Sequence, residues 1–273
     1  EDKTKEKNKN DDDDDDDQPY PFIITKFMKG KTLSYLIEDK FQNCTDPNTT
    51  KMKIFYGIAF ALKYMHNKMK VIHRDIKPAN IFLDENNEPY LGDFGYARLI
   101  DENLKFTNLG TAFYKAPEIF SGEVIDLSED DKYKIDTFSL AVTILETISL
   151  NLKIKDEKNK EHIISPVNKD YDNYDCDISE YISNGKRYII DDDFPENYKD
   201  LIEVCWSQDP SERFSLDHIV EMMENHQLDL PDYNENNFKE YVEKLKNAEN
   251  PNLKKKETKK YSKKKYKPKV TYQ

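Results

Sequence analysis

The sequence predicts a mainly α-helical domain with a small region of short strands, spanning about residues 20–229 of the 273. Apolar residues recur every three or four positions over Lys51–His66, which predicts a long amphipathic helix. A second segment, Ile135–Leu150, is apolar on nearly all sides. Between the two lie only short runs of strand type, separated by turn residues. A helix that is apolar all round lies inside a domain, so we expect Ile135–Leu150 to form its centre.

The two ends of the chain carry opposite charge. Residues 1–19 include seven consecutive aspartates, Asp11–Asp17, whereas residues 253–273 contain ten lysines and one glutamate. The formal net charge is −12 despite that basic end, so the region between the ends is acidic. A nucleic-acid-binding domain would be basic, which argues against that function for the domain. Such polar segments bury too little apolar surface to fold, so we expect residues 1–19 and 230–273 to be disordered.

The cysteines and the hydropathy predict a cytoplasmic, intracellular protein. Cys44, Cys176 and Cys205 lie far apart and are odd in number, which favours a reducing compartment over a disulfide scaffold. No apolar segment approaches the roughly 20 residues that a membrane helix needs. The longest segment, Ile135–Leu150, is interrupted by Asp136, Ser139, Thr143 and Glu146.

In the first half of the chain, turn-forming residues divide the apolar runs into short elements. Tyr20–Thr25 is a short run of strand type, and Thr32 is a candidate cap for a short helix ending at Glu38. The candidate caps for the long helix are Asn48, Thr49 and Thr50. The three expected strands are Val71–Ile72, Ile81–Asp84 and Tyr90–Gly92.

The second half predicts fewer strands and more helix. Residues 96–116 show no clear period and predict an extended loop, and residues 151–178 are polar and predict a surface insertion. After the central helix, two shorter amphipathic helices are expected at Tyr198–Trp206 and Ser215–Met223.

One part of the sequence carries residues suited to phosphoryl transfer. Residues 73–80 read His-Arg-Asp-Ile-Lys-Pro-Ala-Asn, residues 93–95 read Asp-Phe-Gly, and residues 116–118 read Ala-Pro-Glu. This reaction needs a carboxylate to orient a hydroxyl, oxygen ligands for Mg²⁺ and a cation to offset phosphoryl charge. A lone Asp-Phe-Gly is usually only a turn, so it is the ordered set that indicates function.

The ordered set resembles the catalytic motifs of the protein kinase family. The resemblance implies that Asp75 positions the substrate hydroxyl and that Lys77 contacts the γ-phosphate of ATP. It implies that Asn80 and Asp93 hold Mg²⁺, so that ATP and Mg²⁺ are the expected cofactors and ATP and protein substrates the expected partners. It also implies that this chain forms the C-terminal lobe of the family's α+β fold.

The resemblance assigns supporting roles to the neighbours of these residues. His73 and Phe94 are expected to pack together beneath the site, and Arg74 to pair with a phosphate on the activation loop. Thr107 is the candidate phosphosite, because it lies between the Asp-Phe-Gly and Ala-Pro-Glu motifs. The alternative is an ordinary loop threonine.

Later segments resemble the same family. Residues 110–118 resemble the segment that seats the substrate, and Asp136 resembles the aspartate of the central helix that holds the catalytic loop. Residues 205–214 resemble a late motif of the tyrosine-kinase-like branch, which implies a buried ion pair between Arg213 and Glu118. The alternative for Arg213 is a surface arginine.

The run Phe22–Leu33 resembles the last strand of the family's small lobe and the hinge that follows it. This places Thr25 at the gatekeeper position and implies backbone contacts to adenine near Lys26 and Met28. Phe82 would form the floor of the adenine site. The alternative is that these apolar residues are simply core.

The β-rich N-terminal lobe is expected to be absent apart from that strand and hinge. Only 21 residues precede Phe22, and none is glycine, whereas four strands and a helix of average length need about 35 residues. Lys77 and the Gly110-Thr111 pair favour serine/threonine specificity. We therefore expect a truncated serine/threonine protein kinase that is inactive on its own, with a pseudokinase or kinase-like binding scaffold as the alternative.

The lysine-rich segment Lys254–Lys269 predicts a contact with an acidic partner, nucleic acid or an anionic membrane, or a signal for the nucleus. The alternative is a solvated tail that keeps the protein soluble.

Overall fold

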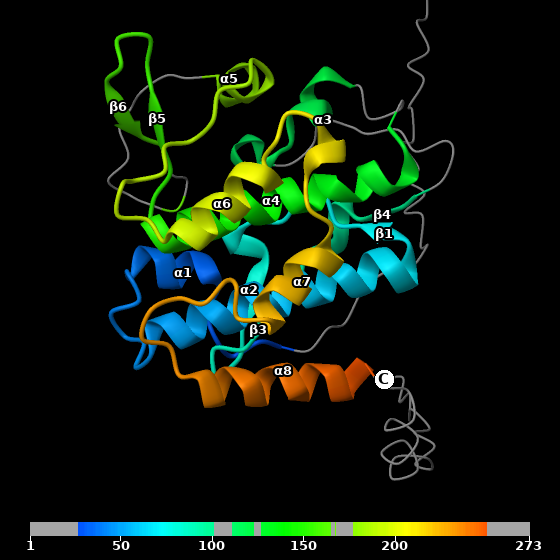
Figure 1. The fold of residues 1–273 in the computed structure, drawn as a ribbon, viewed down its shortest axis with the longest axis vertical. Helices are drawn as coiled ribbons and strands as arrows, with labels where there is room; N and C mark the ends of the chain where they lie inside the picture. The colour runs from blue at the N-terminus through cyan, green and yellow to red at the C-terminus, as the bar shows by residue number, and fades with distance from the viewer. Residues whose placement is uncertain (1–26, 101–110, 123–126, 165–166, 168–176, 250–273) are drawn as a thin grey trace, which may run out of the picture.

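The computed structural model describes residues 27–100, 111–122, 127–164, 167 and 177–249. In this part of the chain α-helices form the body, and the strands pair only two by two (Figure 1). Helix α4 (Glu129–Ser149) runs through the middle, and its Phe138, Val142 and Leu145 are fully buried. The prediction of a mainly helical domain around one central helix is therefore confirmed.

Helices α1 (Leu33–Glu38) and α2 (Pro47–Tyr64) both begin at side-chain caps. The hydroxyl of Thr32 accepts from the backbone N–H of Tyr35, as expected for α1. The cap of α2 is Asp46, whose Oδ1 accepts from the N–H of Thr49 at 3.0 Å. The expected caps Asn48, Thr49 and Thr50 are wrong, because the helix starts earlier, at Pro47. Proline suits the first helical position, since the backbone N–H that it lacks would have no partner within the helix there.

The end of α2 widens before the chain reaches the first strand. Residues Met65–Met69 form a turn of π-helix, and Lys70 follows in the left-handed region with a φ of 56°. Its N–H donates to the carbonyl of Met65, which closes the helix. This turn leads into β1 (Val71–Ile72) and so sets where the following loop starts.

Two small antiparallel pairs frame that loop. β1 pairs with β4 (Arg98–Leu99), and β2 (Ile81–Leu83) pairs with β3 (Pro89–Leu91), with Phe82 opposite Tyr90. The three predicted strands are confirmed within a residue or two. β4 lies inside the predicted extended loop 96–116, and two residues are too few to show a strand period.

The polar segment after α4 also contains strands. β5 (Lys153–Lys155) and β6 (Glu161–Ile163) form a hairpin in part of the expected surface insertion 151–178. Ile154 is fully buried, so this hairpin contributes to the core as well as to the surface.

Helix α4 begins at Glu129, six residues before the predicted start at Ile135. Ser128 caps it by accepting from the N–H of Asp131 at 3.1 Å. Glu129, Asp130 and Asp131 fill its first turn, where negative charge interacts favourably with the helix dipole. Because this first turn is polar, hydrophobic periodicity could not locate the start of the helix.

The described part of the chain forms four further helices, of which the one at residues 196–205 packs on α4 and the one at residues 216–224 packs on α2. The predicted helices Tyr198–Trp206 and Ser215–Met223 correspond to α6 and α7, and Ser215 is the cap of α7. The four are α3 (Pro117–Ser121), α5 (Ile178–Ser183), α6 (Glu196–Cys205) and α7 (Leu216–Glu224). No helix in the described part of the chain is long and apolar enough to cross a membrane.

The prediction that the chain is disordered from residue 230 is wrong for residues 235–249. These form α8 (Glu235–Glu249), which lies against α2 (Figure 1). Phe238, Tyr241 and Val242 are buried, and the ring of Phe238 meets that of Tyr56 edge-on at 5.7 Å. Only one stripe of α8 is apolar, which made its composition look unstructured. Residues 1–26 and 250–273, and with them the lysine-rich segment, lie outside the described residues.

We expect the substitution Phe238→Ala to lower the free energy of unfolding by about 3 kcal/mol, because it removes a buried ring and leaves a cavity. Lys239→Ala, on the exposed face of the same helix, should change it by less than about 0.5 kcal/mol. Urea denaturation of both variants measures this. Equal, near-zero effects would mean that α8 does not pack on α2 in solution.

Candidate active site

The loop between β1 and β2 is held by a carboxylate of the central helix. Asp136 of α4 is fully buried, and its two oxygens accept from the backbone N–H groups of His73 and Arg74, each at 2.8 Å. The loop start is therefore fixed to the centre of the fold rather than to its surface.

A second histidine, which the sequence analysis missed, completes this anchor. His66 lies in the π-turn after α2, and its Nε2 is 2.8 Å from Asp136 Oδ2. Burial alone would raise the pKa of Asp136, but the hydrogen bond and charge of His66, with those of His73, outweigh it and lower the pKa. The only sequence signal for His66 was an ionisable residue at the buried end of an apolar pattern.

Arg74 has a strained backbone and a partly buried guanidinium. Its φ is 67°, a left-handed conformation that non-glycine residues rarely adopt and that persists where surrounding contacts fix it. The bond to Asp136 is one such contact, and Arg74 Nε also donates to the carbonyl of Tyr96 at 2.7 Å. Burial first, and then the charge of Arg98, lower the pKa of Arg74.

Asp75, Lys77 and Asn80 converge on one another. Lys77 Nζ is 2.9 Å from Asp75 Oδ2 and donates at the same distance to Thr111 Oγ1. The amide nitrogen of Asn80 donates to Asp75 Oδ2 at 2.7 Å and to the carbonyl of Asp75 at 2.8 Å. Only 6% of Asp75 is exposed. Two donors, Lys77 Nζ and the amide nitrogen of Asn80, fix the orientation of its carboxylate.

Asp93 joins the same neighbourhood through the backbone of its preceding residue. The N–H of Gly92 donates to the carbonyl of Asn80 at 3.0 Å, and His73 Nε2 lies 3.1 Å from the carbonyl of Gly92. Burial lowers the pKa of His73, while the charges of Asp136, Asp75 and Asp93 act to raise it. The charges of Asp75 and Asp93 therefore both act on the one ring of His73.

Asp93 itself has room to change partners. Its φ is 57°, its Oδ1 accepts from the N–H of Gly95 at 3.2 Å, and its side chain is exposed. The ring of Phe94 meets that of His73 at 5.1 Å, edge-on, with 54% of Phe94 exposed. A Cβ at Gly92 would lie 2.6 Å from the ring of Phe82, so this close approach requires glycine.

Asn80 and Asp93 carry the kind of oxygens that Mg²⁺ prefers. The amide nitrogen of Asn80 is bound to Asp75, which turns its amide oxygen away from that carboxylate. Mg²⁺ is usually bound by one or two protein oxygens together with water and phosphate oxygens, and this pair fits that pattern. The described residues contain no cluster of three His, Cys, Asp or Glu that could form an all-protein metal site.

The segment Thr111–Ala116, which contacts Lys77 through Thr111, is fixed by α4 as well. Ser139 Oγ donates to the carbonyl of Tyr114 at 2.7 Å, and the Tyr114 hydroxyl donates to Glu146 Oε2, which is fully buried. Burial and the charge of Glu146 raise the pKa of Tyr114. Sequence reasoning missed Glu146, which had appeared only as an interruption of an apolar helix.

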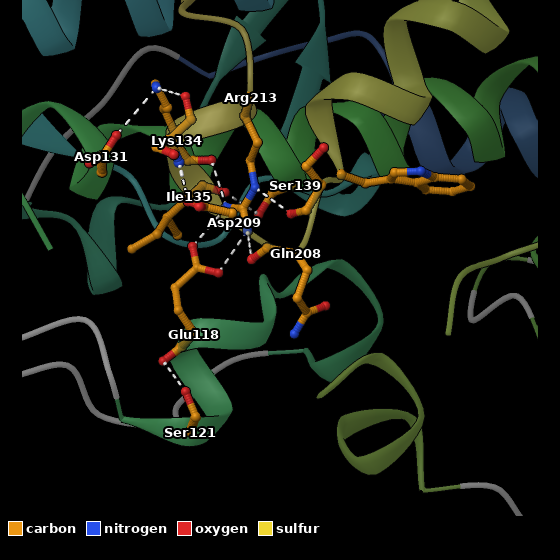
Figure 2. Close-up of polar contacts among 12 residues, drawn as sticks. Glu118, Ser121, Asp131, Lys134, Ile135, Ser139, Gln208, Asp209 and Arg213 are labelled. Carbon is orange, nitrogen blue, oxygen red and sulfur yellow. Dashed lines mark hydrogen bonds and ion pairs between the residues drawn. The ribbon is translucent and has the colours of Figure 1, made fainter. Parts of the chain in front are cut away.

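Glu118 and Arg213 form a fully buried, two-pronged ion pair (Figure 2). The two guanidinium NH groups donate to the two carboxylate oxygens at 2.7 and 2.8 Å. The guanidinium carbon of Arg213 also lies 5.1 Å from the centre of the Phe138 ring. The pair joins α3, which begins within the Ala-Pro-Glu motif, to the turn before α7.

The expected nucleotide residues are only partly described. Thr25 and Lys26 lie outside the described residues, as does Thr107. Met28 is half-buried, and the chain after it lies along β2, with Leu83 N–H donating to the Lys31 carbonyl at 2.8 Å. Phe82, opposite Thr32 in an isolated bridge, is half-buried in β2.

Comparisons with known proteins point to a single family. A family model described as "Protein kinase domain" matches residues 14–224, a region that begins before the expected hinge. The expectation that the small lobe is absent stays a prediction.

The relatives are all much longer proteins. A putative serine/threonine-protein kinase/receptor of Acanthamoeba polyphaga mimivirus is 31% identical over 207 residues, which are 74% of this chain and 11% of the relative. The probable serine/threonine-protein kinase kinY of Dictyostelium discoideum is 29% identical over 209 residues, 74% of this chain and 32% of the relative. The chain spans a third or less of the length of these relatives.

We expect Arg213→Met to lower the free energy of unfolding by about 3–5 kcal/mol, because Glu118 is left buried without its partner. The double variant Arg213→Met/Glu118→Met should recover much of that loss, since no buried charge remains. Urea denaturation of the single and double variants, with Lys199→Met on α6 as a surface control, measures this. A loss below about 1 kcal/mol for the single variant would contradict a buried pair.

The lowered pKa of Asp136 predicts a loss of stability in acid. A carboxylate whose pKa is lower in the folded than in the unfolded state stabilises the fold above its unfolded pKa, about 4. That contribution is lost as the pH falls through the folded pKa. The stability difference between the wild type and Asp136→Asn, from urea denaturation, should therefore shrink below pH 4. Asp200→Asn, on the exposed side of α6, should not show this pattern.

Proposed function

Since this chain belongs to the protein kinase family, we propose that it carries the phosphoryl-transfer centre of a serine/threonine protein kinase that uses ATP and Mg²⁺. The observation that supports this best is the arrangement at Asp75. Its carboxylate is oriented by Lys77 and Asn80, lies near Asp93, and faces the segment that starts at Thr111.

In this proposal Asp75 accepts a hydrogen bond from the substrate hydroxyl and orients its oxygen for attack. Lys77 Nζ, now shared between Asp75 and Thr111, offsets negative charge on the transferred phosphoryl group. Little covalent chemistry is required of the protein, so most of the rate acceleration comes from position and charge.

Asn80 and Asp93 would hold Mg²⁺ through their side-chain oxygens. When bound, the metal neutralises charge on the phosphates of ATP. The Asn80 amide is fixed by its bonds to Asp75, whereas the exposed side chain of Asp93 accepts a single hydrogen bond within the described residues, from the N–H of Gly95. We therefore assign the fixed position of the metal to Asn80 and the adjustable ligand to Asp93.

We assign nucleotide contacts to Thr25, Lys26, Met28 and Phe82, and a regulatory role to Thr107 with Arg74. Support for the second comes from the charge of Arg98, which acts on the Arg74 guanidinium. Arg98 of β4 lies opposite Ile72, two residues before Arg74, and two arginines in one neighbourhood suit a phosphate, which offers several acceptor oxygens.

Specificity for serine and threonine is supported by Lys77. Its contacts to both Asp75 and Thr111 join the catalytic loop to the substrate segment. The relatives are also named serine/threonine kinases.

We expect the isolated chain to bind ATP in a Mg²⁺-dependent way and to transfer phosphate only weakly. Whatever transfer occurs to a mixed serine and threonine peptide should fall at least about 100-fold in Asp75→Asn, because the hydroxyl loses its acceptor. Radiolabelled ATP and calorimetry measure the two properties.

Asp93→Asn should weaken the Mg²⁺ dependence of ATP binding, with Asp200→Asn as the control. Transfer that survives in Asp75→Asn would contradict the proposal. ATP binding without any transfer that depends on Asp75 would favour a kinase-like scaffold instead.

A further inference from the structure

Helix α8 has no role in the transfer described above, and it lies beyond the region matched to the kinase family, which ends at residue 224. Besides covering α2 (Figure 1), it sends one buried side chain as far as β3. β3 leads to Asp93, to which we assigned the adjustable metal ligand. The contact between α8 and β3 therefore links a segment outside the family region to the candidate active site.

The contact is made by Tyr241 of α8, of which only 4% is exposed. A Cβ at Gly57 of α2 would lie 2.4 Å from the hydroxyl oxygen of Tyr241 and 2.6 Å from Cγ of Pro89. Side chains of α8 and β3 therefore meet over one glycine of α2. A larger residue at position 57 would have to displace Tyr241 or Pro89, so this close approach requires glycine.

An ion pair joins the same two elements three residues further along α8, on the same face of the helix. The ammonium of Lys244 pairs with the carboxylate of Glu88, which directly precedes β3. The side chain of Lys244 is 58% exposed, so water screens the pair and its contribution is small. Tyr241 is the stronger contact, because its ring is removed from water.

The pair of strands β2 and β3 connects this contact to both proposed metal ligands. Pro89 starts β3, which is three residues long and ends at Leu91. The next residue, Gly92, donates its N–H to the carbonyl of Asn80 at 3.0 Å, and Asp93 follows. Asn80 directly precedes β2. The proposed metal ligands thus lie at one end of the strand pair, and the contacts to α8 lie at the other.

The end of the strand pair at Pro89 depends on support from outside. Proline has no N–H, and the N–H of Leu83, which lies opposite, donates to the carbonyl of Lys31 at 2.8 Å. Asn80 is held independently by its bonds to the catalytic loop, whereas the side chain of Asp93 is exposed. Loss of the outside support should therefore move Asp93 more than Asn80.

We propose that Tyr241 is a positioning residue that holds β3 on α2 and so fixes Asp93 for Mg²⁺. This role rests on the proposed kinase function. Tyr241 acts only through β3, by its packing on Gly57 and Pro89. A ligand that is already held in place loses less freedom when the metal binds, so the site takes up Mg²⁺ and ATP at lower metal concentration.

Hydrogen exchange at the N–H of Gly92, followed by NMR, measures this support without any ligand. The bond to the Asn80 carbonyl protects that proton, so loosening of β3 exposes it to water. Tyr241→Leu should speed the exchange about tenfold or more. Gly57→Ala, which keeps Tyr241 but crowds it away from β3, should act in the same direction.

Lys246→Met is the matched control for both variants. Lys246 also lies on α8, but its ammonium pairs with Glu224 of α7 at 2.7 Å, away from β3. Its removal should leave the exchange of the Gly92 N–H unchanged. Thermal melting identifies the variants that are folded at the assay temperature, and Gly57→Ala carries the test if Tyr241→Leu is not.

Calorimetry of ATP binding at increasing Mg²⁺ concentration measures the effect on the metal ligand. Tyr241→Leu should raise the Mg²⁺ concentration for half-maximal binding about three- to tenfold, less than the loss of a direct partner of a metal ligand would. In an Asp93→Asn background the same substitution should add nothing, because the ligand that it positions is already absent. A merely structural role for Tyr241 would act equally in both backgrounds.

The two measurements separate this inference from the proposed function. Unchanged Gly92 exchange in the folded variants, or exchange that Lys246→Met speeds equally, overturns the role of Tyr241. So does faster exchange with an unchanged Mg²⁺ dependence of ATP binding. If the wild type binds no ATP but Tyr241→Leu alone speeds the exchange, the support of β3 by α8 holds and the proposed kinase function fails. If neither is observed, both fail.

Discussion

The candidate active site depends on one buried carboxylate. Asp136 gives up its hydration at the centre of the fold, which is costly for a charged group unless donors replace the lost water. Three donors do so: the backbone N–H groups of His73 and Arg74, and the ring of His66. Because the backbone donors belong to the catalytic loop, the loop's position follows from satisfying that charge. The unfavourable φ of Arg74 is compensated by the same bonds.

The same helix also fixes the opposite wall of the site. Asp136, Ser139, Thr143 and Glu146 recur at intervals of three or four residues and so share one face of α4. Asp136 binds the backbone of His73 and Arg74, while Ser139 and Glu146 bind Tyr114. Both segments therefore take their positions from one rigid element, which is what the proposed phosphoryl transfer requires. The Glu118–Arg213 pair then fixes the end of this segment at α3.

Helix α8 supports the site from outside these contacts. Helix α8 begins beyond the matched kinase region and packs on α2, whose C-terminal turn carries His66 and leads to the catalytic loop.

The sequence alone determined the central helix, the short strands and the set formed by Asp75, Lys77, Asn80 and Asp93, because helical periodicity and ordered motifs are local properties. It also contained, as polar interruptions of an apolar helix, the residues that anchor the site. What they bind was decided only by the tertiary structure, since His66, His73 and Asp136 meet across more than sixty positions of chain. The strand β4 and the packing of α8 also depended on partners distant in sequence, which no local pattern records.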